Sequence, residues 1–134
     1  MNFKQAILIN ISTLILSGCL LKDYKGGKII SPSRKYYLTI HVNRTNRSKS
    51  DYAYVIINLY DSKGQLKSTL NTHAGDASEW AVGWEKDKDT IILFSSDISN
   101  NAWKIETGQL KEIAFPDDLN KRAEELGKEK YRTK

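Results

Sequence analysis

The sequence predicts an all-β domain, mainly antiparallel, that is followed by a C-terminal α-helix. Three observations support this prediction. From residue 36 onward, short segments rich in aromatic and β-branched residues alternate with polar stretches, as is typical of strands. Turn signals that contain glycine separate several of these segments. After Pro116 the pattern changes, and apolar residues recur with helical spacing.

The first strong strand signal covers residues 36–42, where alternate side chains from Tyr36 to Val42 are apolar and fall on one face. Residues 52–60 form the next signal, which is rich in aromatic and β-branched residues. Gly64 ends a tight turn after this segment, because glycine adopts positive φ without steric cost. Residues 65–70 are expected to return as the partner strand.

The second half repeats this theme after a polar stretch, residues 71–79, which we expect to be a loop. Residues 80–84 form a short aromatic strand, and residues 85–89 form a charged turn. Residues 90–94 are almost continuously apolar, which predicts a central strand that is buried on both faces. A final hairpin is expected at residues 102–114, with its turn at Thr107-Gly108.

The order of these segments resembles blades of the periplasmic β-propellers. Ser31-Pro32-Ser33-Arg34-Lys35-Tyr36 is similar to their strand lead-in, with Ser33 and Arg34 in place of Asp and Gly. Residues 92–97, followed by 103–108, resemble the later strands of such a blade. A propeller needs about four blades, which is more than this chain can supply. We therefore predict a two-sheet sandwich or curved meander of about seven strands; a closed small barrel is the alternative.

The C-terminal segment, residues 116–134, is predicted to be a helix with a basic tail. Pro116 suits a first helical position, and the two aspartates after it lie where the helix dipole favours carboxylates. One narrow apolar stripe consists of Leu119, Ala123 and Leu126.

Gly127 is expected to end this helix, which leaves residues 128–134 as the tail. We expect the helix to cap one end of the sandwich. A helix that lies on a membrane surface or on a partner is the alternative, although so narrow a stripe inserts weakly into lipid.

The N-terminus has the features of a secretory signal. Lys4 precedes an apolar run, residues 6–16, that is too short to span a bilayer as a stable helix. The run ends in Leu16-Ser17-Gly18-Cys19, which resembles the lipobox of bacterial lipoproteins. This resemblance implies that residues 1–18 are a signal peptide, cleaved between Gly18 and Cys19, and that acylated Cys19 anchors the protein in a lipid bilayer. By the sorting pattern of the family, Leu20 in place of Asp implies the outer membrane, facing the periplasm.

Residues 19–33 are expected to be a lipidated tether, and residues 34–115 the antiparallel β domain. Lysines and a Gly-Gly pair in the tether favour flexibility and contact with lipid headgroups. The alternative is that Ile29 and Ile30 form a first short strand. Because Cys19 is the only cysteine, the domain cannot contain an intrachain disulfide.

The charge of the chain is mildly basic. The formal net charge is +5, and removal of Lys4 with the signal peptide takes away one positive charge. This basicity is compatible with contact to anionic lipids or acidic partners, and equally with ordinary solubility. Nucleic acid is not an expected partner, because the chain lacks the aromatic and basic recognition motifs and is predicted to be in the envelope.

The sequence contains no familiar catalytic or metal-binding motif, and we predict no enzyme activity, no cofactor and no metal. His41 lies within a predicted strand, on the face opposite its apolar residues. His73 lies in the polar stretch with Asp76 and Glu79, a combination that can bind metal or move protons. Nothing in the sequence brings these three side chains into a defined geometry.

Binding to a partner is the remaining class of function. The chain has seven tyrosines and three tryptophans, residue types that dominate interface hot spots. All three tryptophans fall in predicted strands and are expected in the core. The candidate partner-binding residues come from two polar loops, around positions 44–51 and 71–79: Arg44, Arg47, Tyr52, Tyr54, His73, Asp76 and Glu79.

The size, predicted location and strand pattern resemble those of the immunity partners of contact-dependent and type VI secreted toxins. This resemblance implies a periplasmic protein that binds a cell-wall hydrolase or phospholipase and occludes its active site. A structural adaptor of an envelope secretion or assembly machine is the alternative. An inhibitor of host lysozyme fits less well, because such lysozymes are themselves strongly basic. Binding of a small ligand in a crevice of the sandwich is an alternative that the sequence leaves open.

Overall fold

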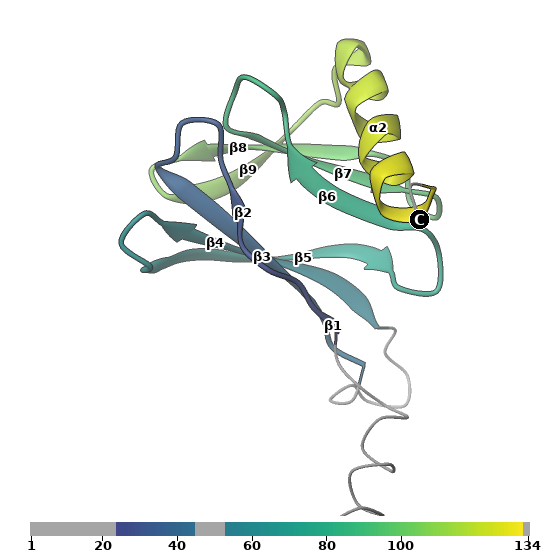
Figure 1. Cartoon of the computed structure of the whole chain (residues 1–134), viewed down its shortest axis with the longest axis horizontal. Coiled ribbons are helices and arrows are strands. Elements are labelled where there is room, and N and C mark those ends of the chain that lie inside the picture. The colour runs from purple at the N-terminus through teal and green to yellow at the C-terminus, as the bar shows by residue number, and fades with distance from the viewer. Residues whose placement is uncertain (1–23, 45–52, 133–134) are drawn as a thin grey trace, which may run out of the picture.

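The computed structural model describes residues 24–44 and 53–132 (Figure 1). Their strands form two antiparallel sheets, and one α-helix follows at the C-terminal end. The predicted all-β fold with two sheets and a C-terminal helix is therefore confirmed. The cleavage and lipidation site at Gly18 and Cys19 lies outside the described residues, as do the candidates Arg47 and Tyr52.

The first sheet contains β1 to β5. β3 (Tyr36–Val42) lies in its middle and pairs on one side with β4 (Tyr54–Asp61), which pairs with β5 (Leu66–Gly75). On its other side β3 pairs with two short strands, β1 (Tyr24–Lys25) and β2 (Ile29–Ile30). Residues 24–30 thus belong to the sheet rather than to a tether, and the β domain begins before residue 34. The short strand that the sequence left open at Ile29 and Ile30 is present.

The second sheet contains β6 to β9 in sequential order. Its strands are β6 (Trp80–Trp84), β7 (Thr90–Ser95), β8 (Asn101–Glu106) and β9 (Gln109–Ile113). The charged turn after β6 and the hairpin turn between β8 and β9 lie where the sequence predicts them. Thr107 (φ 47°) and Gly108 (φ 77°) both have positive φ, the conformation that tight hairpin turns require.

The main core lies between the two sheets and takes side chains from both inner faces. On the first sheet, alternate residues from Leu38 to Val42 in β3 and from Val55 to Leu59 in β4 are fully or nearly fully buried, which confirms the predicted alternation in β3. The buried members of this core are Leu38, Ile40, Val42, Val55, Ile57, Leu59, Ala74, Trp80, Trp84, Ile91, Leu93 and Trp103. All three tryptophans lie in it, as the sequence predicts.

A second, smaller core lies on the outer face of the second sheet. A short 3₁₀ helix, η1 (Asp117–Leu119), leads into α2 (Asn120–Tyr131), and α2 packs across β6 and β7 (Figure 1). The buried members of this core are Ala81, Ile92, Ala102, Leu119, Ala123 and Leu126. β7 is therefore buried on both faces, as predicted. The expectation that the helix caps one end of the sandwich is wrong, because its apolar stripe covers a sheet face.

Two expectations about the bounds of this helix are also wrong. Pro116 precedes the helical residues with an extended backbone, φ −70° and ψ 139°, instead of occupying the first helical position. Gly127 is buried inside α2, where a Cβ atom would lie 3.0 Å from Cε1 of Phe94. The glycine thus permits close packing on β7 and does not end the helix, so residues 128–131 are helical. Within the described residues, no helix is long and apolar enough to cross a membrane.

The polar stretch 71–79 is only partly a loop, because β5 continues to Gly75. The pairing of β4 with β5 shifts register between Tyr54 and Ile56, which marks a bulge opposite Val55. Within this bulge His73 has a positive φ of 61°. Side chains satisfy the displaced backbone: Thr72 donates to the Val55 carbonyl at 2.8 Å, and Asn71 accepts from the His73 N–H at 2.9 Å. Local hydrogen bonding therefore keeps a polar segment in the strand.

Candidate partner-binding site

A polar cluster lies at the end of the sandwich where β3 ends and β6 begins. Arg44, two residues after β3, donates from Nε to Oδ2 of Asp76 at 2.7 Å. Asp76, the first residue after β5, accepts on its other oxygen from the indole Nε1 of Trp80 at 3.0 Å. The strands thus bring together Arg44 and Asp76, which the sequence assigned to two separate loops.

The C-terminal end of α2 completes this cluster. The Nζ of Lys130 lies 2.9 Å from the centroid of the Trp80 ring and donates to the Trp80 carbonyl at 2.9 Å. The Tyr131 hydroxyl accepts from the Trp80 N–H at 2.9 Å and donates to the carbonyl of the same residue at 2.9 Å. We call these five residues, Arg44, Asp76, Trp80, Lys130 and Tyr131, the Asp76 cluster.

The electrostatics of the cluster follow from partial burial and close charges. Burial acts to raise the pKa of Asp76, but hydrogen bonds from Arg44 and Trp80, with the positive charges of Arg44 and Lys130, lower this pKa overall. Burial lowers the pKa of Lys130 to about 8, against an opposing effect of the Asp76 charge. At neutral pH the cluster therefore contains an ionised carboxylate between two cationic side chains.

The cluster lines a cavity of about 390 Å³, together with Ala77, Ser78 and Glu79. Its side chains differ in access: 40% of the Arg44 side chain is exposed, against 19% of the Asp76 side chain. Asp76 thus holds the guanidinium from within while Arg44 reaches the surface. Such an arrangement can bind a carboxylate or carbonyl oxygen of a partner, because the donors of Arg form a planar fork.

The other predicted site residues are placed differently. Glu79 lines the same cavity, and its backbone pairs with Ser96, whose hydroxyl accepts from the Glu79 N–H at 3.1 Å. The ring of His73 makes a T-shaped contact with that of Tyr54, the first residue of β4, with 5.4 Å between the centroids. Among the described residues, no three His, Cys, Asp or Glu side chains are placed to hold a metal ion. The structure brings Glu79 to the Asp76 cluster and leaves His73 in a separate aromatic contact.

Lys130 and Tyr131 are site residues that were not predicted, because residues 128–134 are expected from the sequence to form a tail. A signal for them is present, because they continue the apolar face of the helix: Lys130 follows Leu126 by four positions, and Tyr131 follows Gly127 by four. The expected helix end at Gly127 hid this continuation.

In comparisons with protein-family models, with curated proteins and with solved structures, nothing matches this chain. The candidate site therefore rests on the geometry of the described residues.

Proposed function

We propose that this protein is a lipid-anchored immunity protein of the bacterial cell envelope. In this proposal it binds a secreted antibacterial toxin, either a cell-wall hydrolase or a phospholipase, and occludes the active site without chemistry of its own. The lipobox-like Leu16-Ser17-Gly18-Cys19 supports the location, because two or more acyl chains give stable anchoring. The anchor holds the binding domain at the membrane that it protects, on the periplasmic side of the outer membrane.

The observation that carries the proposal is the Asp76 cluster. Arginine and tyrosine are among the residue types most enriched in interface hot spots, and the cluster presents Arg44 and Tyr131 at the surface, while Trp80 is buried and helps to hold them. Its side chains are already held by hydrogen bonds, either to one another or to the Trp80 backbone, so little conformational freedom is lost when a partner binds them. This preorganisation favours protein recognition.

The charge of the cluster fits the proposed class of toxin. Glycosidases that cleave cell walls act through a pair of Asp or Glu side chains in a cleft. Arg44 presents a positive charge at the surface, supported by Asp76 from behind. Insertion of this guanidinium between or beside such carboxylates would neutralise them and exclude the substrate.

The experiment is a quantitative capture from native cells that make the tagged, lipidated protein, followed by mass spectrometry. One dominant partner at near-equal stoichiometry, whose hydrolase or lipase activity is lost on binding, is the expected result. Arg44→Ala weakens this binding by about tenfold or more, as hot-spot residues do. The matched control is Lys63→Ala, a cation in the exposed turn between β4 and β5. Recovery of several subunits of an envelope machine would instead establish the adaptor function, and equal capture by Arg44→Ala would remove the Asp76 cluster from the interface.

A further inference from the structure

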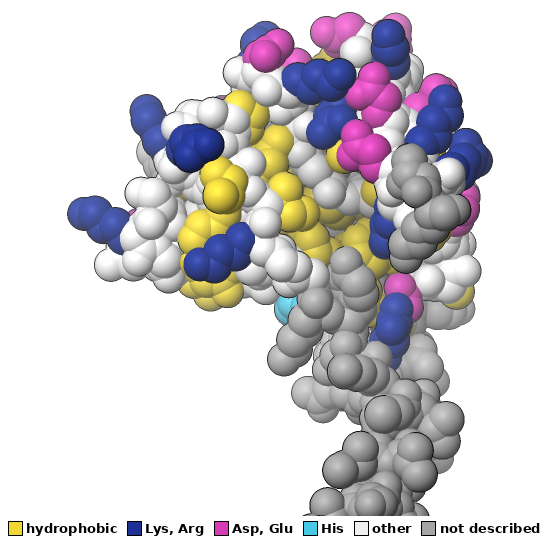
Figure 2. All heavy atoms as spheres, viewed as in Figure 1, with side chains coloured by type: hydrophobic (Ala, Val, Ile, Leu, Met, Phe, Trp, Pro, Cys, Tyr) yellow, Lys and Arg dark blue, Asp and Glu magenta, His cyan; other side chains and the backbone are white. Residues whose placement is uncertain are grey.

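The open side of the sandwich carries a second hollow, separate from the Asp76 cluster. β6 is an edge strand of the second sheet, and it is flanked by β2 of the first sheet and by α2. Hydrophobic side chains gather in the hollow between the layers (Figure 2). The groove along β6 has a volume of about 540 Å³ and is lined by Ile29, Ile30, Pro32, Val82, Trp84 and Leu126, with charged residues at its rim. The linings of this groove and of the Asp76 cavity share no residue.

Alternate residues of β6 bond to β7, and this alternation determines which backbone groups face the groove. The N–H of Glu85 donates to Thr90 at 2.8 Å, and the N–H of Ser96 donates to Glu79 at 3.0 Å. Because bonded and non-bonded pairs alternate in an antiparallel ladder, the intervening Ala81 and Gly83 bond to β7. The backbone groups of Trp80, Val82 and Trp84 therefore point away from the sheet.

Side chains of α2 cap both ends of this free edge. Tyr131 and Lys130 satisfy the N–H and carbonyl of Trp80, and Arg122 donates from Nε to the Trp84 carbonyl at 2.9 Å. Between these caps, the N–H and carbonyl of Val82 have no hydrogen-bond partner in the described part of the chain. One donor and one acceptor of half-buried Val82 thus face the groove, and edge-strand groups of this kind are a template for pairing with another chain.

The walls of the groove decide what kind of partner can reach Val82. Ile30 on β2 is 60% exposed and presents apolar surface beside the groove. The indole of Trp84 donates to the Ile29 carbonyl at 3.0 Å, which holds β2 against the second sheet. Because β2 and α2 flank the groove along β6, pairing with β6 of a second copy would bring these flanking elements of both copies together. A single extended segment carries no such flanking elements.

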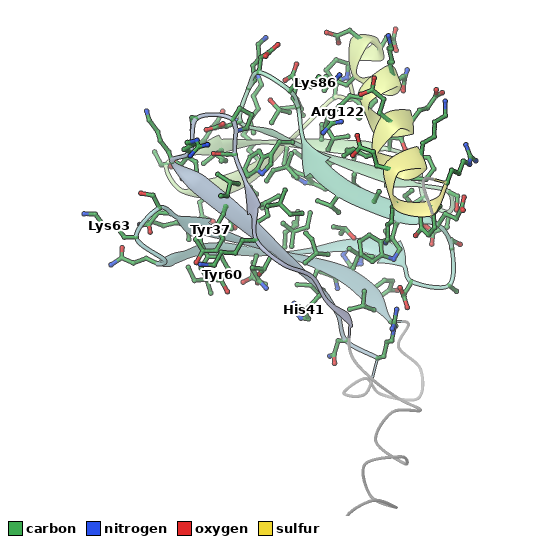
Figure 3. All side chains as sticks on the ribbon, in the orientation of Figure 1. Tyr37, His41, Tyr60, Lys63, Lys86 and Arg122 are labelled. Atoms are coloured by element: carbon green, nitrogen blue, oxygen red, sulfur yellow. The ribbon has the colours of Figure 1, made fainter. Side chains whose placement is uncertain are left out.

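The rim of the groove selects for an uncharged segment. Lys86 lies 3.4 Å from Glu125, and Arg122 lies 3.5 Å from Glu125 and 3.4 Å from Glu129. Within the lining, two acidic residues, Glu85 and Glu129, balance two basic residues, Lys86 and Arg122, so the groove favours a segment without net charge. Figure 3 shows Lys86 and Arg122 near the contact between α2 and the second sheet.

We propose that this groove binds an extended, uncharged segment of a partner protein as an additional strand on β6. The segment pairs through its backbone with the N–H and carbonyl of Val82, and its alternate apolar side chains pack against Ile29 and Ile30. Binding in this groove goes beyond the proposed function, because it does not require the partner to be a toxin and because no residue of the Asp76 cluster lines the groove.

The test uses purified lipidated protein in detergent micelles and a fluorescein-labelled peptide, Thr-Val-Thr-Val-Thr-Val-Thr, with binding followed by anisotropy. We expect saturable binding of this peptide. Binding should be lost when every backbone nitrogen of the peptide is methylated, because the methylated peptide cannot pair with β6 as a strand. Val82→Pro removes the free N–H without touching the ladder to β7, and we expect affinity to fall by about tenfold or more.

A second variant protects the test against failure of the proline variant to fold. Ile30→Asp places a charge on the apolar wall, and we expect it to weaken binding as strongly. Leu66→Asp is the matched control, since Leu66 is 55% exposed at the start of β5 and does not line the groove. Three results would overturn the proposal: no binding at about 1 mM peptide, equal binding of the methylated peptide, or an equal loss of affinity in Leu66→Asp. A dissociation constant of about 1 mM corresponds to only about 4 kcal/mol of binding free energy.

Discussion

The two sheets differ most in their outer faces. The outer face of the second sheet is apolar and buried where α2 covers β6 and β7, whereas that of the first sheet is half-exposed in the described residues. On the first sheet Tyr37 and Tyr60 stack with 4.9 Å between ring centroids and an interplanar angle of 10° (Figure 3). Further along this face, the Asn58 amide lies 3.3 Å from Nδ1 of His41 and accepts from Thr69 at 2.9 Å.

This difference between the sheets follows from the burial patterns of two central strands. β4 alternates buried and half-buried residues, so it offers one apolar face, whereas β7 is buried at almost every position. A strand with two apolar faces needs a layer on each side. The helix therefore stabilises the second sheet, and the first sheet is left with a polar and aromatic face towards solvent.

The largest expected effect comes from comparing one isoleucine on each outer face. Ile92 on β7 is fully buried under α2, whereas Ile56 on β4 is only half-buried. We expect Ile92→Ala to reduce the free energy of unfolding by about 2–5 kcal/mol, since it leaves a cavity. Ile56→Ala should cost about 1 kcal/mol or less. Denaturant unfolding measures both, and equal losses would refute the difference between the faces.

Close packing of α2 on β7 provides the second comparison. Gly127→Leu places a side chain where Phe94 already lies, and we expect it to reduce the free energy of unfolding by about 1–3 kcal/mol. Gly27, in the connection from β1 to β2, has open space where a side chain would be added. Gly27→Leu is therefore the control, and a similar loss in both variants would show that contact with Phe94 is unimportant.

The Asp76 cluster joins the two sheets, and its carboxylate predicts a pH dependence. The folded-state pKa of Asp76 is lowered, so its contribution is present above its ordinary pKa and is lost as pH falls through the folded-state pKa. We expect Asp76→Asn to reduce the free energy of unfolding by about 1 kcal/mol or less at neutral pH, because Arg44 is partly exposed. Unfolding measured across acid pH should show this difference shrink as pH falls. A difference that does not change with pH would contradict the ionic contribution.

The pKa of Lys130 predicts a second pH dependence of stability, at alkaline instead of acid pH. Its folded-state pKa of about 8 lies below the ordinary lysine value of 10.5, so this group makes stability rise as pH increases between those values. Carbon-13 NMR of the lysine side chains should show one resonance that titrates near pH 8 and disappears in Lys130→Met. Asp76→Asn should lower this pKa further, because the Asp76 charge raises it. If the midpoint of the Lys130 titration were unchanged in Asp76→Asn, the charge of Asp76 would have no influence on Lys130.

The smallest effect is expected on the exposed face of the first sheet. Tyr60→Ala removes the stack with Tyr37, and we expect it to reduce the free energy of unfolding by about 0.5–1 kcal/mol. Tyr37→Ala should cost a similar amount, and the double variant should cost less than the sum of the two. Additive losses in this cycle would mean that the rings do not stabilise each other.

Much of the fold could be predicted because strand patterns are local. The aromatic strand at 80–84 and the continuous apolar strand that begins at Thr90 lie where their residues predict them. The bulge at His73 could not be predicted, because its backbone bonds through Thr72 to a residue 17 positions away, Val55. The polar composition of that segment pointed to a loop, and the hydrogen bonds that keep it in β5 exist only when β4 lies beside it.

The candidate site shows the same division. Arg44 and Asp76 were predicted individually, because charged residues beside strand ends are visible in the sequence. Their meeting at 2.7 Å depends on the pairing of β3 with β4 and of β4 with β5. Lys130 and Tyr131 reach Trp80 because α2 continues past Gly127, where the absence of a side chain lets the helix pack closely on Phe94 of β7.

By itself, the sequence of this protein determined the all-β character, the positions of the main strands and turns and the presence of a C-terminal helix. These features depend on local periodicity and turn chemistry, which a linear chain displays directly. The tertiary structure alone decided which sheet face the helix covers, which distant side chains surround Asp76 and which backbone groups of β6 point away from β7. Each of these depends on contacts between segments far apart in the chain, and local patterns do not encode such distances.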